Sequence, residues 1–485
     1  MMSWFRLFAA SLLLAGFRLS ATGEPRQFTP AELVADERHL FSVLEEVHPD
    51  LYATATKTVM DSVRQAWRQS LQEPQTRIEA WWSMAPLVAL LGDGHTGLDV
   101  PAEEFKAARQ GGVLAFPLRL GFDKRGAVRV ERVYGSVFDI APGDRLLRIN
   151  GLDADSLTQA FLERMSGESV AFRRIQVAKL FRGLLWMADI QPPYRLDVEP
   201  AGGGGLVTAM VPGVTQAQVL VQDSLLSEGR PKADWRFQRL DDGAALLAFN
   251  TMIDARAFGE FLSAIFQEVR DRPVTGLVVD LRANMGGRLS LGDTLLSYIT
   301  DKPSMLMQRE DWKVSASYKR HLRHQIPAWA RWMPGWMLSG GPEAYYLRAP
   351  VGSFWTIRRV AMPPLPNPLR FDGPVCFLIG SGTYSSATML ASAVGDYKLA
   401  TLIGEETGGW PNSYGEAYSF SLPSTGLIAH ASTARFVRPS GDASLKGGVL
   451  PDIVVDAARH DGPDGDPALA RARQWIRDGG EPAAP

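Results

Sequence analysis

The sequence predicts an α/β protein in which helices pack against a sheet, and the second half of the chain carries the evidence. Residues 375–379 form a short apolar run, which is typical of a buried strand, and apolar residues recur at helical spacing from Ser385 onward. Upstream, a helical pattern over residues 255–270, a strand pattern over 276–281 and a second helical pattern over 289–299 follow one another. Strands that alternate with helices favour a sheet covered by helices.

Length and charge set the first limits on the class of protein. The chain has 485 residues, which suggests about two to four domains with ample core material. Its formal net charge is −2, so there is no basic excess, and nucleic acid is excluded as a partner. Cys376 is the only cysteine, which excludes a disulfide within the chain. Because it lies inside an apolar run, we expect a small core residue rather than a reactive thiol.

Residues 1–23 have the pattern of a secretory signal peptide. Arg6 precedes an apolar segment over residues 7–17, and small residues follow at 20–23. The apolar segment is too short to span a bilayer. We therefore expect export to the periplasm or secretion, and an anchor that stays uncleaved is the alternative.

Residues 29–105 are predicted to form an N-terminal helical domain. Thr29 ahead of Pro30 is a suitable N-cap with proline at the first helical position. The helix expected over residues 78–91 runs into a glycine-rich turn that contains His95. Such a turn pushes the imidazole out of the helix. A histidine that only bonds the backbone and a functional histidine both fit this position.

Residues 111–200 carry alternating segments that predict strands, with a turn at 123–126. The segment GDRLLRING, residues 143–151, resembles the strand-and-turn core of PDZ domains, which present a sheet edge or groove to a peptide. No obvious carboxylate-binding loop accompanies it. A spacer and a peptide-binding domain therefore both fit this PDZ-like insert.

Residues 206–485 hold the predicted α/β core, and an insertion over residues 301–371 breaks its strand–helix rhythm. The insertion concentrates tryptophans among prolines and glycines. A lid, an apolar wall beside a substrate and a loop that contacts a membrane all fit such a cluster, but we favour a local core under a long insertion. The tryptophans concerned are Trp329, Trp332, Trp336 and Trp355.

A serine stands where the strand over 375–379 gives way to a helix. Unpaired N–H groups and the positive end of the dipole at a helix N-terminus favour an anion, so a nucleophile beside an oxyanion site fits here, as does a plain N-cap. Serine hydrolysis needs a hydroxyl, a base and N–H donors aimed at the oxyanion. Separate segments supply candidates for each part: Ser385 or Ser386 as the hydroxyl, His95 as the base, and Gly286 with Gly287 as bare backbone.

No metal or other cofactor is predicted. His39 and His48 lie on or at the end of helices, His321 and His324 in a basic part of the insertion and His430 along a strand, and no pair has ligand spacing supported by cysteine or aspartate.

Taken together, these segments make the chain resemble the tail-specific, or carboxy-terminal processing, serine protease family, including its tricorn-like branch. The resemblance implies a crotonase/Clp-protease-like β/α catalytic core over residues 206–485, behind an N-terminal helical domain and a PDZ-like insert. It also implies a serine peptidase that acts on unstructured polypeptide ends. The segments that carry it are VVDLRANMGG, TYSSATML, DYKLATLIGEETGG, GVLPDIVV and GDRLLRING, with HPDLY and DGHT resembling the leader of bacterial members.

The resemblance assigns roles to individual residues. The family's S-A-S-E and G-E-x-T patterns place the nucleophile on Ser385. The backbone N–H of Ser386 would then join the oxyanion hole with an amide of Gly286 or Gly287.

The choice of base separates two branches of the family. The processing-protease branch uses a lysine followed four residues later by a glutamine, and Trp410 and Tyr414 occupy those positions here, which excludes a Ser-Lys mechanism. The tricorn-like branch uses a histidine, and His95 in DGHT matches its place. A glutamate orients that histidine from the segment before G-V-x-P-D. This chain has no glutamate there, so Asp442 is the nearest substitute.

Two functions are carried forward from the sequence. The first is a serine peptidase that hydrolyses polypeptide outside the cytoplasm. The alternative is a non-catalytic protein on the same fold that binds a peptide or, as interphotoreceptor retinoid-binding proteins do, an apolar ligand, with the tryptophan-rich insertion as its wall. We favour catalysis because the serine, the histidine and the glycine pair are all present.

Overall fold

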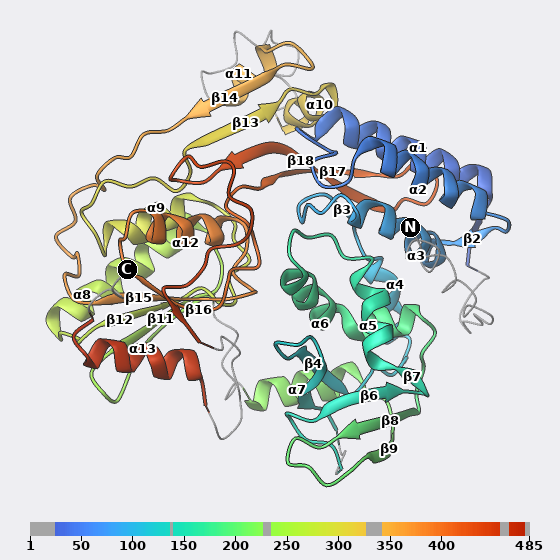
Figure 1. Ribbon diagram of the computed structural model, residues 1–485, viewed down its shortest axis with the longest axis horizontal. Helices are drawn as coiled ribbons and strands as arrows, with labels where there is room; N and C mark the ends of the chain where they lie inside the picture. The colour runs from blue at the N-terminus through green and yellow to red at the C-terminus, as the bar shows by residue number, and fades with distance from the viewer. Residues whose placement is uncertain (1–24, 136–138, 227–233, 326–341, 456–464, 481–485) are drawn as a thin grey trace.

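The structure, a computed structural model, describes residues 25–135, 139–226, 234–325, 342–455 and 465–480. Figure 1 shows an α/β lobe on one side and the N-terminal helices with a second sheet-containing module on the other, and strands β17 and β18 run between them. The expected signal peptide lies outside the described residues. Within the described residues, no helix combines the length and apolar character needed to cross a membrane.

A six-stranded sheet forms the centre of the α/β lobe. Its order is β10-β11-β12-β15-β16-β19, in which β10 and β11 form an antiparallel hairpin and the other neighbours run parallel. Parallel strands separated by helices confirm the predicted α/β class. The bounds are β10 (Trp235–Arg239), β11 (Ala245–Phe249), β12 (Leu277–Asp280), β15 (Val375–Ile379), β16 (Thr401–Gly404) and β19 (Ile453–Val454).

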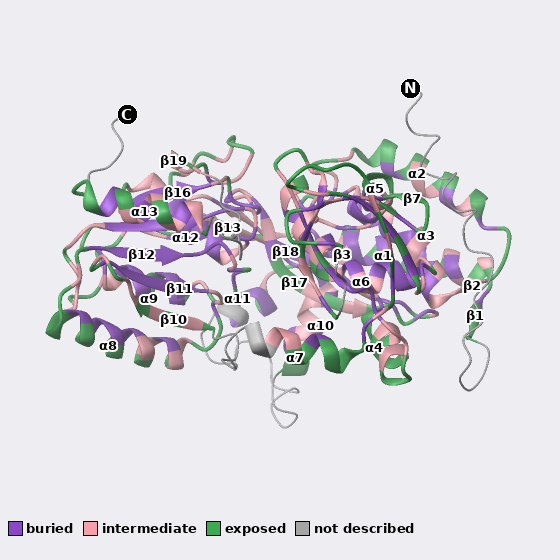
Figure 2. Cartoon of the chain, turned by 90° about the horizontal axis from the view of Figure 1, so that it is seen from below, coloured by how far each residue is buried: buried purple, intermediate pink, exposed green. Residues whose placement is uncertain are grey.

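Helices cover both faces of this sheet because side chains of each strand alternate between them. Val279 and Phe377 join the apolar cluster of three helices on one face, whereas Val278 and Cys376 pack with one helix on the other. Cys376 is fully buried, as predicted for a core residue. In Figure 2, β12 is buried along its length while α8 alternates buried and exposed residues. The helices are α8 (Ala255–Asp271), α9 (Ser290–Ser297), α12 (Ser386–Asp396) and, on the second face, α13 (Pro467–Arg477).

A second sheet, in the order β14-β13-β18-β17, links the two sides of the molecule. Two of its strands come from the predicted insertion over 301–371, whose described part also builds a small apolar cluster around Val314 and Tyr346 with Trp355 packed on it. This arrangement fits the local core expected there, and Trp329, Trp332 and Trp336 lie outside the described residues. The elements are β13 (Arg309–Lys313), α10 (Ala316–Gln325), α11 (Pro342–Arg348), β14 (Phe354–Arg358), β17 (Tyr414–Ser421) and β18 (Ile428–Val437).

The N-terminal region is helical and packs on the second sheet. Thr29 caps α1 in a reciprocal capping box with Glu32, as the sequence suggested for its N-cap. One turn further on, the buried Asp36 carboxylate accepts hydrogen bonds from the main chain of Ser424 and Thr425, in the turn between β17 and β18. The elements are β1 (Gln27–Phe28), α1 (Pro30–Val47), α2 (Lys57–Ser70), β2 (Gln75–Thr76), α3 (Arg77–Ala89), β3 (Gly97–Leu98) and α4 (Ala102–Gln110).

Residues 118–226 form a third sheet with its own helices, named here the β4–β9 module. The sheet order is β4-β5-β6-β8-β9 with β7 on β6, and its apolar core is continuous with that of the N-terminal helices. GDRLLRING supplies β6 and the tight turn after it, where Asn150 and Gly151 have positive φ. The elements are β4 (Leu118–Phe122), β5 (Val128–Val133), β6 (Arg145–Ile149), β7 (Leu152–Asp153), α5 (Ala154–Leu162), α6 (Val170–Met187), β8 (Tyr194–Glu199), β9 (Val207–Val211) and α7 (Gln216–Leu226).

We predict that Asp36→Ala destabilises the protein strongly for a single substitution. One buried and one partly buried main-chain N–H group lose their acceptor, at about 1–3 kcal/mol each, so the free energy of unfolding falls by about 2–6 kcal/mol. Urea unfolding measures this, with Glu103→Ala on an exposed face of α4 as the control. Equal stability of the two variants would show that Asp36 does not hold α1 on the sheet.

Candidate active site

His95 projects from a turn between α3 and β3. The helix ends at Ala89, Gly92 takes a positive φ of 67°, and the His95 main-chain N–H donates to Asp93 Oδ1 over 2.9 Å. β3 then pairs antiparallel with β18. The turn is therefore held at both ends, and the imidazole is directed away from α3 as predicted.

Ser385 lies at the junction of β15 and α12 in a strained backbone conformation. Its φ of 53° and ψ of −126° fall in a region that residues with a side chain rarely adopt. Although Ser385 is the N-cap of α12, its side chain makes no capping hydrogen bond. The plain N-cap interpretation therefore does not account for this serine, whose hydroxyl is left for another partner.

That partner is His95. Its Nε2 atom lies 3.1 Å from Ser385 Oγ, although the two residues are 290 positions apart in sequence. Burial lowers the pKa of His95 below its usual value, while the Asp93 charge and a hydrogen bond with the Tyr414 main chain oppose this shift. The imidazole is consequently uncharged near pH 7, and it can accept a proton from the serine whenever Nε2 carries none.

Two main-chain N–H groups lie beside the serine without a protein acceptor among the described residues, namely those of Gly287 and Ser386. Ser386 is the first residue of α12, where N–H groups have no partner within the helix. Its hydroxyl donates to the Gly287 carbonyl oxygen over 2.6 Å, which ties the two segments together. The pair can serve as an oxyanion hole for a substrate bound at Ser385.

The alternative donor, Gly286, is excluded by the structure. Its N–H donates to Asn284 Oδ1 over 2.8 Å and is therefore occupied. Gly286 instead provides space, because a Cβ there would lie 2.8 Å from both Ser385 Cβ and the Ser386 nitrogen. Of the two glycines considered from the sequence, only Gly287 retains an available amide.

Asp442 does not orient His95 and that expectation is corrected. Its side chain is exposed, and its Oδ1 atom accepts a hydrogen bond from the main chain of Ser444 over 3.0 Å. The main-chain oxygen of Asp442 accepts from Asn412. These local hydrogen bonds stabilise a surface turn. The Asp442 carboxylate therefore interacts with Ser444 and not with the imidazole of His95.

A different aspartate lies next to the imidazole. Asp93 is buried, with Oδ1 4.0 Å from His95 Nδ1, while Oδ2 accepts from Ser432 Oγ over 2.6 Å and lies 3.1 Å from His48 Nε2. Burial alone would raise the pKa of Asp93, but the hydrogen bond from His48 outweighs it and holds the pKa well below its usual range. Asp93 therefore places a fixed negative charge beside His95.

The His48 ring is oriented by its own main-chain contact. The Asp50 N–H donates to His48 Nδ1 over 3.0 Å, so the proton of the neutral ring is on Nε2 and faces Asp93. Tyr414 packs against the ring at a centroid distance of 4.6 Å. No role was predicted for Asp93 or His48, although Asp93 lies within the DGHT segment and His48 within the HPDLY segment.

On its Nδ1 side, His95 also meets a tyrosine and a glutamate. Tyr384 Oη lies 3.2 Å from His95 Nδ1 and 3.2 Å from Glu168 Oε2. Burial, with the charges of Glu168 and Asp93, raises the pKa of Tyr384 far above its usual value, so the phenol keeps its proton. Position 384 directly precedes the serine, whereas nothing in the sequence singled out Glu168.

Asp93, His95 and Glu168 are residue types that can bind a metal ion, and they lie close together. Within the described parts of the chain, one set of three potential ligands, Asp93, His95 and Glu168, has its nitrogen and oxygen atoms within 4.8 Å of one another. Both Asp93 oxygens already accept hydrogen bonds from protein donors, and Glu168 accepts from Tyr384. Because a cation would have to displace these donors, the set does not fit a resident metal.

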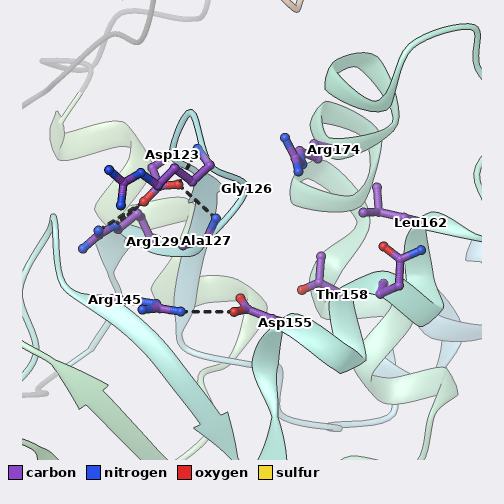
Figure 3. A pocket seen from close by; sticks show the side chains of 11 residues that line it. Asp123, Gly126, Ala127, Arg129, Arg145, Asp155, Thr158, Leu162 and Arg174 are labelled. Carbon is purple, nitrogen blue, oxygen red and sulfur yellow. Dashed lines mark hydrogen bonds and ion pairs between the residues drawn. The ribbon is translucent and has the colours of Figure 1, made fainter.

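A polar pocket of about 350 Å³ lies apart from these residues, in the β4–β9 module. Figure 3 shows Arg129 hydrogen-bonded to Asp123 and Arg145 in an ion pair with Asp155. Arg174 projects from a helix and also lines this pocket. None of the predicted site residues lines it. Its charged walls distinguish it from an apolar ligand site.

We predict that Asp93→Asn destabilises the protein in a pH-dependent manner. Because the folded-state pKa of Asp93 is depressed, its charge contributes stability above the unfolded pKa near 3.8, and this contribution is lost as pH falls below that value. The difference in urea midpoint between wild type and variant should thus be full at pH 6 and shrink below pH 4. A difference that grows on acidification would contradict the assignment.

Comparisons with known proteins bear on the family and on the fold. Residues 244–455 match the profile of peptidase family S41. A mutant of CPAF superposes with a TM-score of 0.63 at 15% identity, covering 93% of this chain and 99% of that chain. Mature CPAF complexed with lactacystin gives 0.57 at 16% identity, covering 93% and 96%. At these identities the likeness shows the fold. No curated protein sequence matches the chain.

Proposed function

This chain carries a domain of peptidase family S41, the tail-specific protease family, and from that premise we propose that it is a serine peptidase acting through Ser385 and His95. His95 Nε2 removes the proton from Ser385 Oγ as the oxygen attacks a peptide carbonyl. The imidazolium then protonates the leaving amine. Water hydrolyses the acyl-enzyme by the same route and regenerates the serine.

The observation that carries this proposal is the 3.1 Å approach of His95 Nε2 to the hydroxyl of a strained serine. Backbone strain costs about 1–3 kcal/mol and is found mainly where function requires it. The serine has no capping bond that would give it a purely structural purpose. The Ser385 hydroxyl, the His95 base and the strained backbone of Ser385 thus lie together, as a nucleophilic site requires.

The developing oxyanion would rest on the amides of Gly287 and Ser386. Loss of one such donor typically costs about 3–4 kcal/mol of transition-state stabilisation, so the hole matters nearly as much as the base. Asp93 adds a buried negative charge 4.0 Å from His95 Nδ1, which favours the imidazolium as it forms. Position 414, where a Ser-Lys enzyme would carry glutamine, instead places its ring against His48.

The substrate is proposed to be polypeptide, in keeping with the family. We also propose that the enzyme works outside the cytoplasm, on the basis of the signal-like pattern of residues 1–23. The alternative, a protein that binds an apolar ligand, has less support, since the described part of the insertion expected to form its wall packs Trp355 onto a local apolar cluster.

A fluorophosphonate probe should label the wild-type protein on Ser385. Ser385→Ala should abolish labelling, and His95→Gln should slow it by about 10² to 10⁴, because the base no longer accepts the proton. The matched control is Ser419→Ala. Ser419 Oγ also lies 2.8 Å from a histidine, His430 Nδ1, but on a surface strand.

Ser419→Ala should label like wild type. The proposal fails if wild type remains unlabelled while a known serine hydrolase in the same tube reacts, or if Ser385→Ala labels at the wild-type rate.

Ser386→Ala should lower kcat/KM for a peptide substrate by about 3- to 10-fold. The variant keeps the main-chain N–H but loses the 2.6 Å hydrogen bond to the Gly287 carbonyl, which is worth about 0.5–1.5 kcal/mol. Steady-state kinetics measure the effect, which should fall mainly on kcat. An unchanged kcat would show that this bond does not set the geometry of the oxyanion hole.

A further inference from the structure

We propose that Tyr384 and Glu168 are positioning residues that hold His95 in the tautomer with its proton on Nδ1, so that Nε2 presents a lone pair to Ser385. This inference rests on the proposed peptidase function and adds to it the orienting groups that Asp442 does not supply. Tyr384 Oη lies 3.2 Å from His95 Nδ1, and 3.3 and 3.2 Å from the two Glu168 oxygens. The hydroxyl thus bridges the imidazole and the carboxylate.

Counting protons gives the direction of each hydrogen bond. An ionised carboxylate can only accept, so the single Tyr384 hydroxyl proton goes to Glu168. Oη then offers a lone pair to His95 Nδ1, which must carry the ring proton to donate to it. With the proton on Nδ1, Nε2 is an acceptor for the Ser385 hydroxyl, as a general base requires.

The tyrosine is held in place from several sides. Phe172, in the first turn of α6, stacks on its ring at 3.8 Å with planes only 3° apart. Ser169 caps that helix through the Phe172 N–H and donates its hydroxyl proton to the Gly408 carbonyl over 2.8 Å. Gly94 leaves space for the hydroxyl, because a Cβ there would lie 2.1 Å from Tyr384 Oη. The phenol oxygen therefore has one well-defined position.

Asp93 cannot perform this task in the observed geometry. Its nearest oxygen is 4.0 Å from His95 Nδ1, beyond hydrogen-bond distance, and both of its oxygens already accept from other donors. Asp93 acts through its charge, whereas Tyr384 and Glu168 select the tautomer. Glu168 comes from the connection between α5 and α6, so the β4–β9 module contributes directly to the orientation of the base.

The arrangement also predicts a pH dependence. The ionisable groups that face Glu168 among the described residues are Asp93, His95 and Tyr384. Burial, together with the Asp93 charge, raises the pKa of Glu168 to about 8. Once protonated, Glu168 can donate to Tyr384 Oη, and the phenol proton then turns to His95 Nδ1. The ring proton moves to Nε2, where it blocks the base, so kcat/KM should rise with pH through about 8.

Kinetics of two conservative variants test the proposal. Tyr384→Phe keeps the ring stacked on Phe172 but removes the hydroxyl, and Glu168→Gln removes the charge. Each should lower kcat by about 10² to 10⁴ with KM within about threefold, because the substrate is not contacted. In Tyr384→Phe the rise near pH 8 should vanish and leave only the titration of His95 below 6.5. The controls are Tyr397→Phe, just beyond the C-terminal end of α12, and Glu103→Gln on α4, and both should retain wild-type kcat.

Nitrogen-15 NMR of the His95 ring, assigned by comparison with His95→Gln, tests the tautomer without relying on activity. Above pH 8.5 the wild type should carry its proton on Nδ1, and Tyr384→Phe should shift it toward Nε2. If the tautomer is as stated but the wild type neither cleaves peptide nor reacts with a fluorophosphonate, the peptidase proposal fails and the positioning role stands. If the wild type is active while Tyr384→Phe keeps full kcat or an unchanged tautomer, the positioning role is overturned.

Discussion

The pairing of β3 with β18 is the constraint on which the site depends. β3 is only two residues long, and it lies directly after the turn that carries His95. Its partner strand also pairs with β13 and β17, so the turn is anchored to the sheet that links both sides of the molecule. Ser385, by contrast, is anchored to the α/β sheet through β15. Only when the two sheets keep their relative position do the imidazole and the hydroxyl lie within hydrogen-bond distance.

Buried charge strengthens this constraint. The Asp93 carboxylate accepts hydrogen bonds from the turn itself and from Ser432 on β18, and it lies 3.1 Å from His48 Nε2 just beyond α1. Three separate elements therefore converge on one anion. A buried carboxylate without such donors would carry a large desolvation penalty, so the pocket tolerates little displacement of any of them. The hydrogen bonds that hold Asp93 in the turn also keep its negative charge next to His95.

Much of the fold followed from local patterns. The strand over 375–379 has the predicted bounds, and the helix predicted over 255–270 extends one residue further. These elements depend on periodicity and on terminal residues that act over a few positions. The insertion was harder to interpret, because its strand β13 pairs with β18, more than one hundred residues further along the chain. Pairing over such a distance leaves no local signature.

By itself, the sequence determined the candidate nucleophile, the candidate base and the absence of a lysine at position 410, because each depends on residue type within a short motif. The tertiary structure alone decided which glycine amide is available and which acidic residue lies near the imidazole. Neither Asp442 nor Glu168 belongs to a local pattern that shows which one lies near His95. A hydrogen bond forms only when donor and acceptor are about 3 Å apart, and that distance is set by the tertiary structure. Glu168 meets Tyr384 across 216 positions, a distance over which residue spacing carries no information and only the packing of the module against the core brings the two atoms together.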